Sequence, residues 1–392
     1  MKYLALGVFL AGMVTTVHAA TPVTQTVYEG TIGKSPIVLE TLTNGDHGAG
    51  QYFYRKHRAS ISLRLDKGQW SELADGCTYD LAICDVKAHL KLTPTGGGLS
   101  GTWTANGKSL PVTLKQVAAR KSQAEGEPAD PSTLFAMDRG SDVTADPYLF
   151  RQLAGETLYG PETRTGYIGY RTATDKDTGI HFIRLTAAPN ATALAKVNAL
   201  LDQRRYEMVS YGLECRATPQ SDGPAGGTLG DWDSYESTVT YATDSLLVIQ
   251  EGGSTYCGGA HPNNSFTYSM YDLRRGEVFD LNRVLKLTHP GKDADGHAAQ
   301  VNTPEYDALL ARLTPESPWF SADVDAECLG PDGAESFGAS YSLTFNAKGL
   351  VLSLTDLPHV MGACMGDYYV IPYAALKTLW TPEAKLYFPE AR

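Results

Sequence analysis

A chain of 392 residues with 44 acidic and 33 basic side chains carries a formal net charge of −11 at pH 7. The length predicts roughly two domains, and an acidic surface disfavours nucleic acid as a partner. Such a surface either attracts cationic partners or only keeps an exported protein soluble, and both interpretations stay open.

The N-terminal residues are typical of a cleaved signal peptide. Lys2 supplies a positive charge, and residues 4–14 form an apolar stretch that is too short to span a bilayer. Val17-His18-Ala19 then places small or aliphatic residues where a signal peptidase cleaves. We therefore expect a signal peptide over residues 1–19 and a periplasmic or secreted protein with no membrane span after cleavage.

The six cysteines predict disulfides, because an exported protein folds in an oxidising compartment. Proximity in the sequence favours three pairs, although six cysteines permit other pairings. These pairs are Cys77–Cys84, Cys215–Cys257 and Cys328–Cys364. A Cys-His metal site is the alternative, but no CxxC or HxxxH spacing supports it.

Residues 20–115 are expected to form an all-β module. Residues 60–65 alternate apolar and polar side chains with a period of two, as a half-buried strand does. Similar short segments, rich in aromatic and branched residues, occupy 26–33, 36–42, 50–55, 88–92, 99–104 and 109–114. Turn sequences such as Asn44-Gly45 and Asn106-Gly107 separate them. Regular short strands with such turns favour a small barrel or a sandwich.

A charged segment without periodicity follows the β module. Residues 118–130 contain Gly and Pro and have little apolar surface to bury. Because this composition is typical of linkers, residues 116–145 are predicted to connect two domains.

Residues 146–388 are expected to form an α+β domain. Pro189-Asn190 opens a predicted helix that carries Leu194, Val197, Leu201 and Met208 on one face. Predicted strands lie at 166–170, 179–185, 237–241, 246–250, 266–273, 340–345, 350–354 and 367–371, and short helices at 281–287, 304–313 and 372–380. Strands grouped around separate helices favour an antiparallel sheet.

Several short blocks in residues 235–382 together resemble a known family. They are Gly258-Gly259-Ala260-His261-Pro262, Tyr271-Asp272-Leu273, Gly276-Glu277-Val278, Asp280-Leu281, Asn346-Ala347-Lys348-Gly349-Leu350-Val351 and Tyr369-Val370-Ile371-Pro372-Tyr373 with Leu376. The family is an extracytoplasmic α+β domain of unknown function. It occurs in the lysozyme-sensing anti-sigma factor of the sigma-V type and in the non-catalytic part of a peptidoglycan deacetylase.

The resemblance implies a binding domain associated with the cell wall or with lysozyme. It supplies no catalytic residues, because the deacetylase chemistry belongs to a different domain, which we expect this chain to lack. We likewise expect no cytoplasmic anti-sigma segment and no membrane helix, so signalling by the route of the sensor is not predicted.

Acidic side chains lie beside aromatic ones in residues 231–236. Asp231, Asp233 and Glu236 are close in sequence to Trp232 and Tyr235. A sugar-binding cleft or a glycosidase uses acidic and aromatic side chains in this combination. An exposed polar loop is the alternative interpretation.

The predicted ligand-facing residues are Trp232, Tyr235, Tyr256 and His261, because Trp and Tyr provide contact area at modest entropic cost. His261 has two interpretations: a base or metal ligand, or a ring that hydrogen-bonds the glycine turn. Asp272 is either its carboxylate partner or a side chain that stabilises the following turn.

The histidines that could gather around zinc are His261, His289, His297 and His359. No two of them have the i, i+4 spacing of a helical metal site, so no metal is predicted.

No catalytic residue and no cofactor is predicted. Gly-x-Ser-x-Gly is missing, and no Gly-x-Gly-x-x-Gly follows a strand and opens a helix. We therefore expect an exported cell-envelope binding protein without catalytic activity, whose partner is lysozyme, another cationic protein or peptidoglycan. The first alternative is an envelope glycan hydrolase that uses the acidic residues near Trp232. The second is a structural partner in an envelope complex.

Overall fold

The computed structural model describes residues 21–44, 47–73, 85–124, 145–217, 235–255, 263–292, 296–329, 341–355 and 357–389. It divides the chain into two compact units, Met1–Gln152 and Leu153–Arg392, and each is described by itself. The predicted signal peptide, Cys77, Cys84, Cys257 and the side chain of Cys215 lie outside the described residues. Within these described ranges, no helix is both long and apolar enough to cross a membrane.

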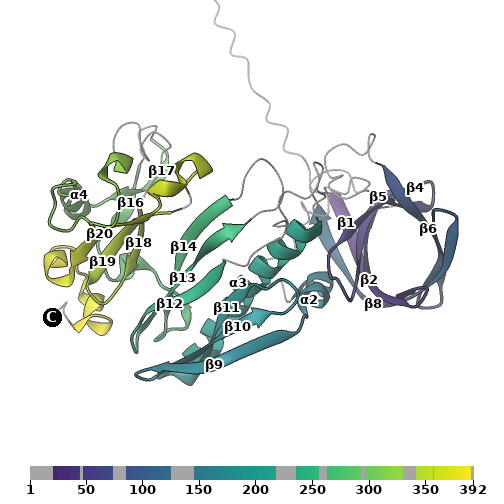
Figure 1. The fold of residues 1–392 in the computed structure, drawn as a ribbon, viewed down its shortest axis with the longest axis horizontal. Coiled ribbons are helices and arrows are strands. Elements are labelled where there is room, and N and C mark those ends of the chain that lie inside the picture. Colours follow the sequence, from purple (N-terminus) through teal and green to yellow (C-terminus); the bar gives the residue numbers. More distant parts are fainter. Residues whose placement is uncertain are drawn as a thin grey trace, which may run out of the picture. The chain divides into compact units, whose positions relative to one another are not determined.

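The first unit is a closed antiparallel barrel of eight strands, seen along its axis in Figure 1. Neighbouring strands follow the chain order, and pairing of β1 with β8 closes the ring. The strands are β1 (Thr21–Ile32), β2 (Ser35–Asn44), β3 (His47–Tyr54), β4 (Ile61–Asp66), β5 (Gln69–Leu73), β6 (Val86–Thr95), β7 (Gly98–Ala105) and β8 (Lys108–Ala124). The predicted all-β module is therefore confirmed, and of the two predicted forms, barrel and sandwich, it is the barrel.

Successive residues of the strands face opposite sides of the barrel wall, which gives it an inner and an outer core. Tyr52 belongs to the inner core, with Ile37 and Leu39. Its neighbour Phe53 lies on the outer face, where its ring packs edge-on against Tyr148 at a centroid distance of 5.3 Å. The period of two that the sequence shows is thus the period with which side chains alternate between the two cores.

The barrel unit extends beyond residue 115, where the sequence analysis placed the start of a linker. Strand β8 continues to Ala124, which pairs with Thr21 of β1. The charged residues of this last stretch are Arg120, which pairs with Asp146, and the exposed Lys121, and composition alone does not separate such a strand from a linker. Residues 125–144 of the predicted linker are outside the described part of the chain.

Helix α2 (Pro147–Leu153) is attached to the outside of the barrel through Asp146. Its carboxylate accepts hydrogen bonds from the backbone N–H groups of Tyr148 at 2.8 Å and Leu149 at 3.0 Å, as an N-cap does. The same buried carboxylate pairs with Arg120 of β8 at 2.9 Å. The amide of Gln25 on β1 donates to it at 3.3 Å.

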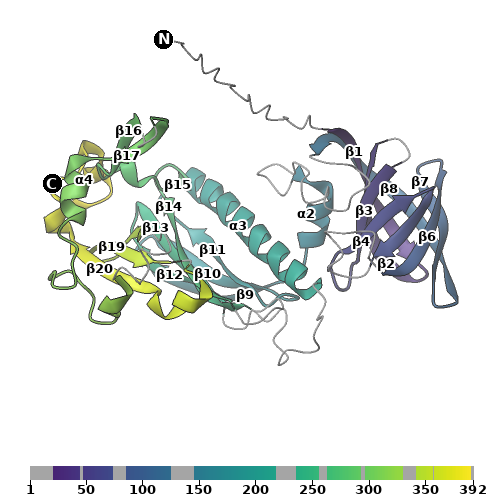
Figure 2. The same cartoon turned by 90° about the horizontal axis from the view of Figure 1, so that it is seen from above.

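Two of the antiparallel sheets in the second unit share one helix. The first sheet has the order β11-β10-β9, and the second has the order β12-β13-β14-β15. Their strands are β9 (Thr157–Thr165), β10 (Ile168–Asp175), β11 (His181–Ala187), β12 (Glu236–Ala242), β13 (Leu246–Thr255), β14 (Asn263–Asp272) and β15 (Glu277–Val278). Helix α3 (Ala191–Ala217) lies across these strands in Figure 2.

Helix α3 forms where the sequence analysis places a helix, and its predicted apolar face is buried. Asn190 caps it, since its side-chain oxygen accepts from the N–H groups of Thr192 at 2.9 Å and Ala193 at 3.2 Å. Val197 and Leu201 pack into a core built from both sheets. The helix therefore joins the two sheets into one layer-on-layer arrangement.

The rest of the second unit packs on the other face of β13. Leu247 and Ile249 face α3, whereas Leu246 and Val248 belong to an aromatic-rich core with the C-terminal elements. These elements are the hairpin β16 (Thr288–Lys292) and β17 (Ala298–Asn302), helix α4 (Pro304–Leu310), and the sheet β18 (Tyr341–Phe345), β19 (Gly349–Leu354) and β20 (Gly366–Pro372). The predicted α+β class is confirmed.

The predicted helices at 281–287 and 372–380 are shorter in the structure. Each contains a single 3₁₀ segment, η2 (Leu281–Arg283) and η6 (Tyr373–Leu376). Apolar residues cluster here because the segments contact the aromatic core closely, and close packing does not require a regular α-helix. Two more 3₁₀ segments, η3 (Ala326–Leu329) and η5 (His359–Cys364), are joined by the predicted disulfide Cys328–Cys364, with Cα atoms 5.5 Å apart. A last segment, η7 (Pro382–Leu386), ends the fold.

Candidate functional site

Two of the predicted site residues can be placed, and they face opposite sides of the same sheet. Tyr235 is 6% exposed and precedes β12 on the side of α3. Glu236 is exposed, and it lines a hollow on the other face. Trp232, Tyr256 and His261 lie outside the described residues, as do Asp231 and Asp233. The structure therefore does not join Tyr235 and Glu236 in one site, because adjacent residues of a strand alternate between faces.

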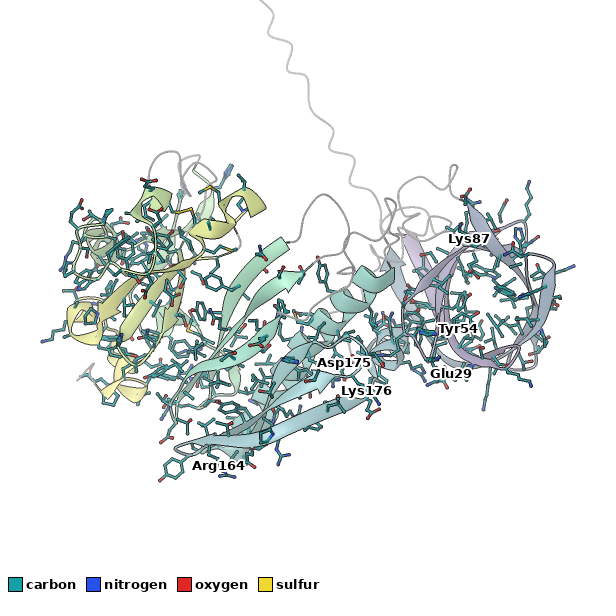
Figure 3. All side chains as sticks on the ribbon, in the orientation of Figure 1. Glu29, Tyr54, Lys87, Arg164, Asp175 and Lys176 are labelled. Carbon is teal, nitrogen blue, oxygen red and sulfur yellow. A yellow bond between two sulfur atoms is a disulfide. The ribbon has the colours of Figure 1, made fainter. Side chains whose placement is uncertain are left out.

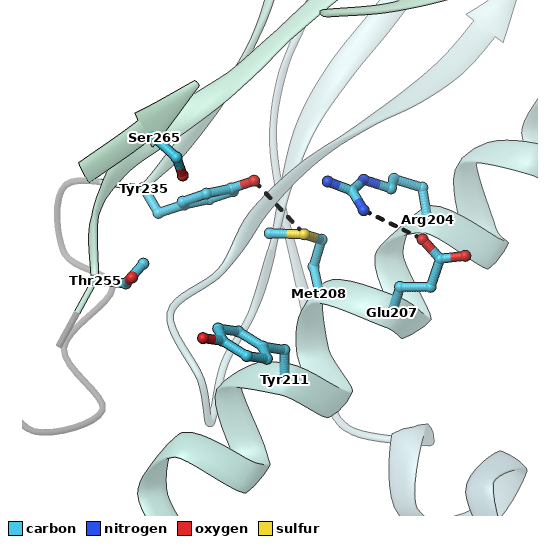
Figure 4. Close-up of a pocket in the computed structure, with 7 residues that line it drawn as sticks. All are labelled: Arg204, Glu207, Met208, Tyr211, Tyr235, Thr255 and Ser265. Atoms are coloured by element: carbon cyan, nitrogen blue, oxygen red, sulfur yellow. Dashed lines mark hydrogen bonds and ion pairs between the residues drawn. The ribbon is translucent and has the colours of Figure 1, made fainter. Parts of the chain in front are cut away.

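Tyr235 lines a hollow between α3 and the sheet, which we call the helix-side hollow. Its volume is about 350 Å³, and Figure 4 shows its lining. The lining residues are Arg204, Glu207, Met208, Tyr211, Tyr235, Thr255 and Ser265. The Tyr235 hydroxyl donates to the Met208 sulfur at 3.6 Å, which holds the ring against the helix.

Arg204 forms ion pairs with two carboxylates near the helix-side hollow. Its guanidinium contacts Glu251 of β13 at 2.7 Å and Glu207 at 3.2 Å. Burial favours the neutral form of Arg204, but the charge of Glu251 outweighs it and raises the pKa of Arg204. Burial, together with the charge of Glu251, also raises the pKa of Tyr271 to about 12. Arg204 therefore stays charged and Tyr271 stays neutral near neutral pH.

The second hollow lies on the opposite face of the same strands, and we call it the strand-face hollow. Its volume is about 390 Å³. Its side-chain lining includes Glu236, Thr238, Gln250, Asn264, Phe266 and Met365. Four of these side chains can form hydrogen bonds, a carboxylate, a hydroxyl and two amides, and they line the hollow together with one aromatic ring.

The backbone of Gly252 and Gly253 forms part of the lining of the strand-face hollow. Gly252 pairs with Phe266 across the strands, and a Cβ at Gly252 would lie 2.5 Å from the Phe266 Cβ. Only glycine therefore allows the Phe266 side chain its present position. Phe266 packs edge-on against Tyr268 with ring centroids 5.7 Å apart, which fixes the ring further.

A chain of hydrogen bonds holds the Gln250 amide in the strand-face hollow. Gln250 donates to the Tyr268 hydroxyl at 3.3 Å, and this hydroxyl donates to Asp367 of β20 at 3.1 Å. Ser353 of β19, which is fully buried, donates to the same carboxylate at 2.7 Å. Burial and the negative charge of Asp367 raise the pKa of Tyr268, so its proton remains in place. These hydrogen bonds orient the Gln250 amide in the strand-face hollow.

Asp272 has the turn-stabilising role that the sequence analysis offered as one of two alternatives. Its carboxylate accepts from the backbone N–H groups of Arg274 at 2.8 Å and Arg275 at 3.0 Å. It also accepts from Arg283 at 3.0 Å and from the Tyr387 hydroxyl at 2.6 Å. The confirmed interpretation is thus a buried anchor for the turn after β14 and for the C-terminal residues.

No three potential metal ligands gather among the residues that the structure describes. His289 is exposed, and its Nδ1 lies 3.0 Å from the carbonyl oxygen of Pro290. His297 is exposed as well, and the side chain of His359 is outside the described residues.

Sequence reasoning missed most of the lining of both hollows. Gln250 and Glu251 are adjacent in β13 but serve different hollows, and Met365 comes from a distant segment. A period-two reading of β13 would have separated Gln250 from Glu251. No sequence signal would have brought Met365 to the same place.

No protein-family model and no curated protein matches the chain. Two solved structures are similar to part of it. One, described as a DUF3298 family protein from Pseudomonas aeruginosa PAO1, has 15% sequence identity and a TM-score of 0.29, with 58% of this chain and 93% of that chain covered. The other, described as a member of the DUF3298 family from Bacteroides fragilis NCTC 9343, has 15% identity and a TM-score of 0.32, with 59% and 96% covered. These values are too low for either likeness to assign a function.

Proposed function

We propose that the protein is an exported binding protein of the cell envelope, without catalytic activity, and that the strand-face hollow binds a glycan of the cell wall. The observation that carries the proposal is the position of the Phe266 ring among the Glu236 carboxylate and the Gln250 and Asn264 amides. A sugar presents C–H groups that pack on an aromatic ring. It also presents hydroxyls that donate to carboxylates and exchange hydrogen bonds with amides.

The carboxylates near both hollows favour binding over hydrolysis. A glycosidase needs two carboxyl groups that flank the scissile bond at roughly 5–10 Å from each other. Among the described residues that line the strand-face hollow, Glu236 is the single carboxylate. Glu207 and Glu251, near the other hollow, are both paired with Arg204.

A cationic protein such as lysozyme is the second candidate partner, and the net charge of −11 supports it. Electrostatic attraction to an acidic protein accelerates association and weakens steeply as salt rises. This candidate differs from the glycan in its salt dependence, because binding of a neutral sugar to amides and a ring changes little with ionic strength.

Titration calorimetry of the full chain with soluble peptidoglycan fragments tests the proposal. We expect saturable binding that is weakened about tenfold by Phe266→Ala and several-fold by Glu236→Gln. Glu207→Gln, the same chemical change in the helix-side hollow, is the matched control and should leave the affinity unchanged. Chromatography of the same mixtures shows whether the fragments are cleaved.

Each other outcome points to a different function. Cleavage of the fragments that is lost in Glu236→Gln would establish the hydrolase alternative. Salt-sensitive binding of lysozyme with no binding of fragments would favour the cationic partner. Equal weakening by Glu207→Gln and Glu236→Gln would contradict the strand-face hollow as the site.

A further inference from the structure

The interior of the barrel holds a carboxylate in a mainly apolar setting. Glu72 of β5 accepts a hydrogen bond from the Tyr52 hydroxyl at 2.8 Å and another from Nε1 of Trp103 at 3.0 Å. Both donors are neutral and both meet the same oxygen, Oε2. Among the residues that the structure describes, Glu72 has no ion-pair partner.

The residues around Glu72 lie at one rim of the barrel. Tyr54 is the last residue of β3, Ile61 is the first of β4, and Glu72 is the second-last of β5. Because neighbouring strands are antiparallel, the ends of β3 and β5 and the start of β4 meet at the same edge. Trp103, near the end of β7, belongs to this edge as well.

This rim is accessible to solvent, although it opens into the barrel core. Glu72, Tyr54, Ile61 and Trp103 are each only partly buried, in contrast to the fully buried inner residues such as Leu39. The side chains of the barrel, with Tyr54 labelled, are drawn in Figure 3. An eight-stranded barrel is wide enough to be filled by side chains or to hold one small ligand. Because several interior side chains at one rim are partly exposed, a small ligand can contact them there from solvent.

Aromatic rings surround the carboxylate. Tyr52 and Tyr54 pack edge-on with ring centroids 5.5 Å apart, and Trp103 approaches from the opposite side of Glu72 through its indole N–H. Burial and the charge of Glu72 raise the pKa of Tyr52, so this phenol remains a neutral donor. Rings of this kind attract a cation through their electron-rich faces, and the attraction adds to that of a carboxylate.

We propose that this rim binds a small alkylammonium ligand. The ammonium group lies against Oε1 of Glu72 and the rings of Tyr54 and Trp103, and the alkyl chain packs against Ile61, a partly buried apolar residue at this rim.

The role of Glu72 as a hydrogen-bond acceptor does not by itself require a charge. A neutral Gln would accept the same two hydrogen bonds, and it would not carry the desolvation cost of an unpaired carboxylate. A cation in the rim offsets this cost, because it supplies the missing opposite charge. A cation bound at the rim therefore explains why position 72 carries a carboxylate and not a neutral amide.

The test is calorimetry and tryptophan fluorescence of the full chain titrated with n-pentylammonium. Two probes of similar shape serve as ligand controls, neutral 1-pentanol and anionic pentanoate, and tetramethylammonium reports whether N–H donors are needed. We expect saturable binding of pentylammonium, and neither control should bind in the same concentration range. Glu72→Gln keeps the shape of the side chain and should weaken binding by at least about tenfold, because it removes the charge.

Two further variants keep the test decisive. Glu29→Gln makes the same change on the outer face of the same barrel and should leave the affinity unchanged. Tyr54→Leu removes a ring at the rim, leaves Glu72 in place and should weaken binding several-fold, so it serves also if Glu72→Gln does not fold. Equal binding of pentanol and pentylammonium, or unchanged affinity in Tyr54→Leu or in folded Glu72→Gln, would overturn the proposal.

Discussion

Asp272 shows how one buried carboxylate organises a large part of the second unit. It is 0% exposed and accepts from two backbone N–H groups, a guanidinium and a phenol. Arg283 and Tyr387, which lie far apart in the sequence, meet at this carboxylate. A buried charge is tolerated because each of its hydrogen-bonding positions is used.

Replacement of Asp272 by Ala should lower the free energy of unfolding of the second unit by about 3–5 kcal/mol, because Arg283, Tyr387 and two backbone N–H groups would lose their buried acceptor. Urea unfolding followed by circular dichroism measures the effect. Asp280→Ala is the matched control: Asp280 is exposed and caps η2 through the Asn282 N–H at 2.9 Å. Its loss should cost about 1 kcal/mol, and a similar loss in both variants would contradict the anchoring role of Asp272.

The phenol of Tyr387 makes the stability of this unit sensitive to alkaline pH. Burial and the hydrogen bond to Asp272 raise the pKa of Tyr387 from 10.0 to about 12. In the unfolded chain the phenol ionises at its ordinary pKa, so the stabilisation is complete below pH 10. It is lost progressively as pH rises toward 12.

We therefore expect Tyr387→Phe to lose part of this dependence, so that its stability falls less steeply than that of the wild type between about pH 10 and 12. Urea midpoints over this range provide the measurement. Tyr159→Phe serves as the control, since Tyr159 is 57% exposed. Parallel curves for wild type and Tyr387→Phe would rule out the contribution of this phenol.

At the scale of elements, helix α2 depends on the barrel more than on its own sequence. The helix has only 7 residues, which is too short to be stable alone in water. Tyr148 packs on Phe53, and Asp146 both caps the helix and pairs with Arg120. Arg151 adds an ion pair with Glu29 of β1.

Asp146→Ala should free α2 from the barrel, because it removes the cap and leaves Arg120 without its partner. We expect a loss of about 3–5 kcal/mol in the stability of the first unit and faster amide hydrogen exchange over residues 147–153. Hydrogen exchange read by mass spectrometry locates the change. Asp66→Ala is the control: Asp66 is exposed and ends β4, so its replacement should leave hydrogen exchange in α2 unaltered. Unaltered exchange in Asp146→Ala would contradict the attachment of α2 through Asp146.

Strand β13 illustrates which features of an element can be predicted. Its run of apolar residues predicts a buried strand correctly, since Leu246, Leu247, Val248 and Ile249 are all buried. The existence of two different cores on its two faces follows only from what packs there. Helix α3 covers one face and the C-terminal elements cover the other, and the sequence of β13 is equally apolar toward both.

At the scale of the whole molecule, the chain forms two compact units, and the disulfide Cys328–Cys364 belongs to the second. The cysteines are 36 residues apart. A cross-link of this length stabilises a fold by about 3–4 kcal/mol, mainly because it restricts the unfolded chain.

Replacement of both cysteines, Cys328→Ser with Cys364→Ser, should therefore lower the thermal transition of the second unit and leave that of the barrel in place. Differential scanning calorimetry resolves the two transitions, and Asp146→Ala identifies the barrel transition by shifting it alone. A double replacement that moved both transitions equally would show that the units unfold as one.

The candidate sites were predictable only in part, and the reason is the way strands alternate. Adjacent acidic and aromatic residues at 235 and 236 suggested one binding surface, yet the pleat of the sheet directs Tyr235 to α3 and Glu236 to the opposite face. Phe266 and Met365 reach the strand-face hollow from other elements. No pattern in the sequence indicates a site at Glu72, because Tyr52 and Trp103, which donate hydrogen bonds to it, belong to other strands of the barrel.

Local patterns in the sequence predict many strands, one long helix and one disulfide: period-two alternation indicates the strands, Asn190 and the apolar face indicate α3, and proximity indicates the pair Cys328–Cys364. These features depend on neighbours within a few residues or on a simple chemical preference. Closure of the barrel, the attachment of α2, the two cores around β13 and the lining of each hollow were decided by the tertiary structure. They require contacts between residues far apart in the chain, and such contacts arise only when the elements pack.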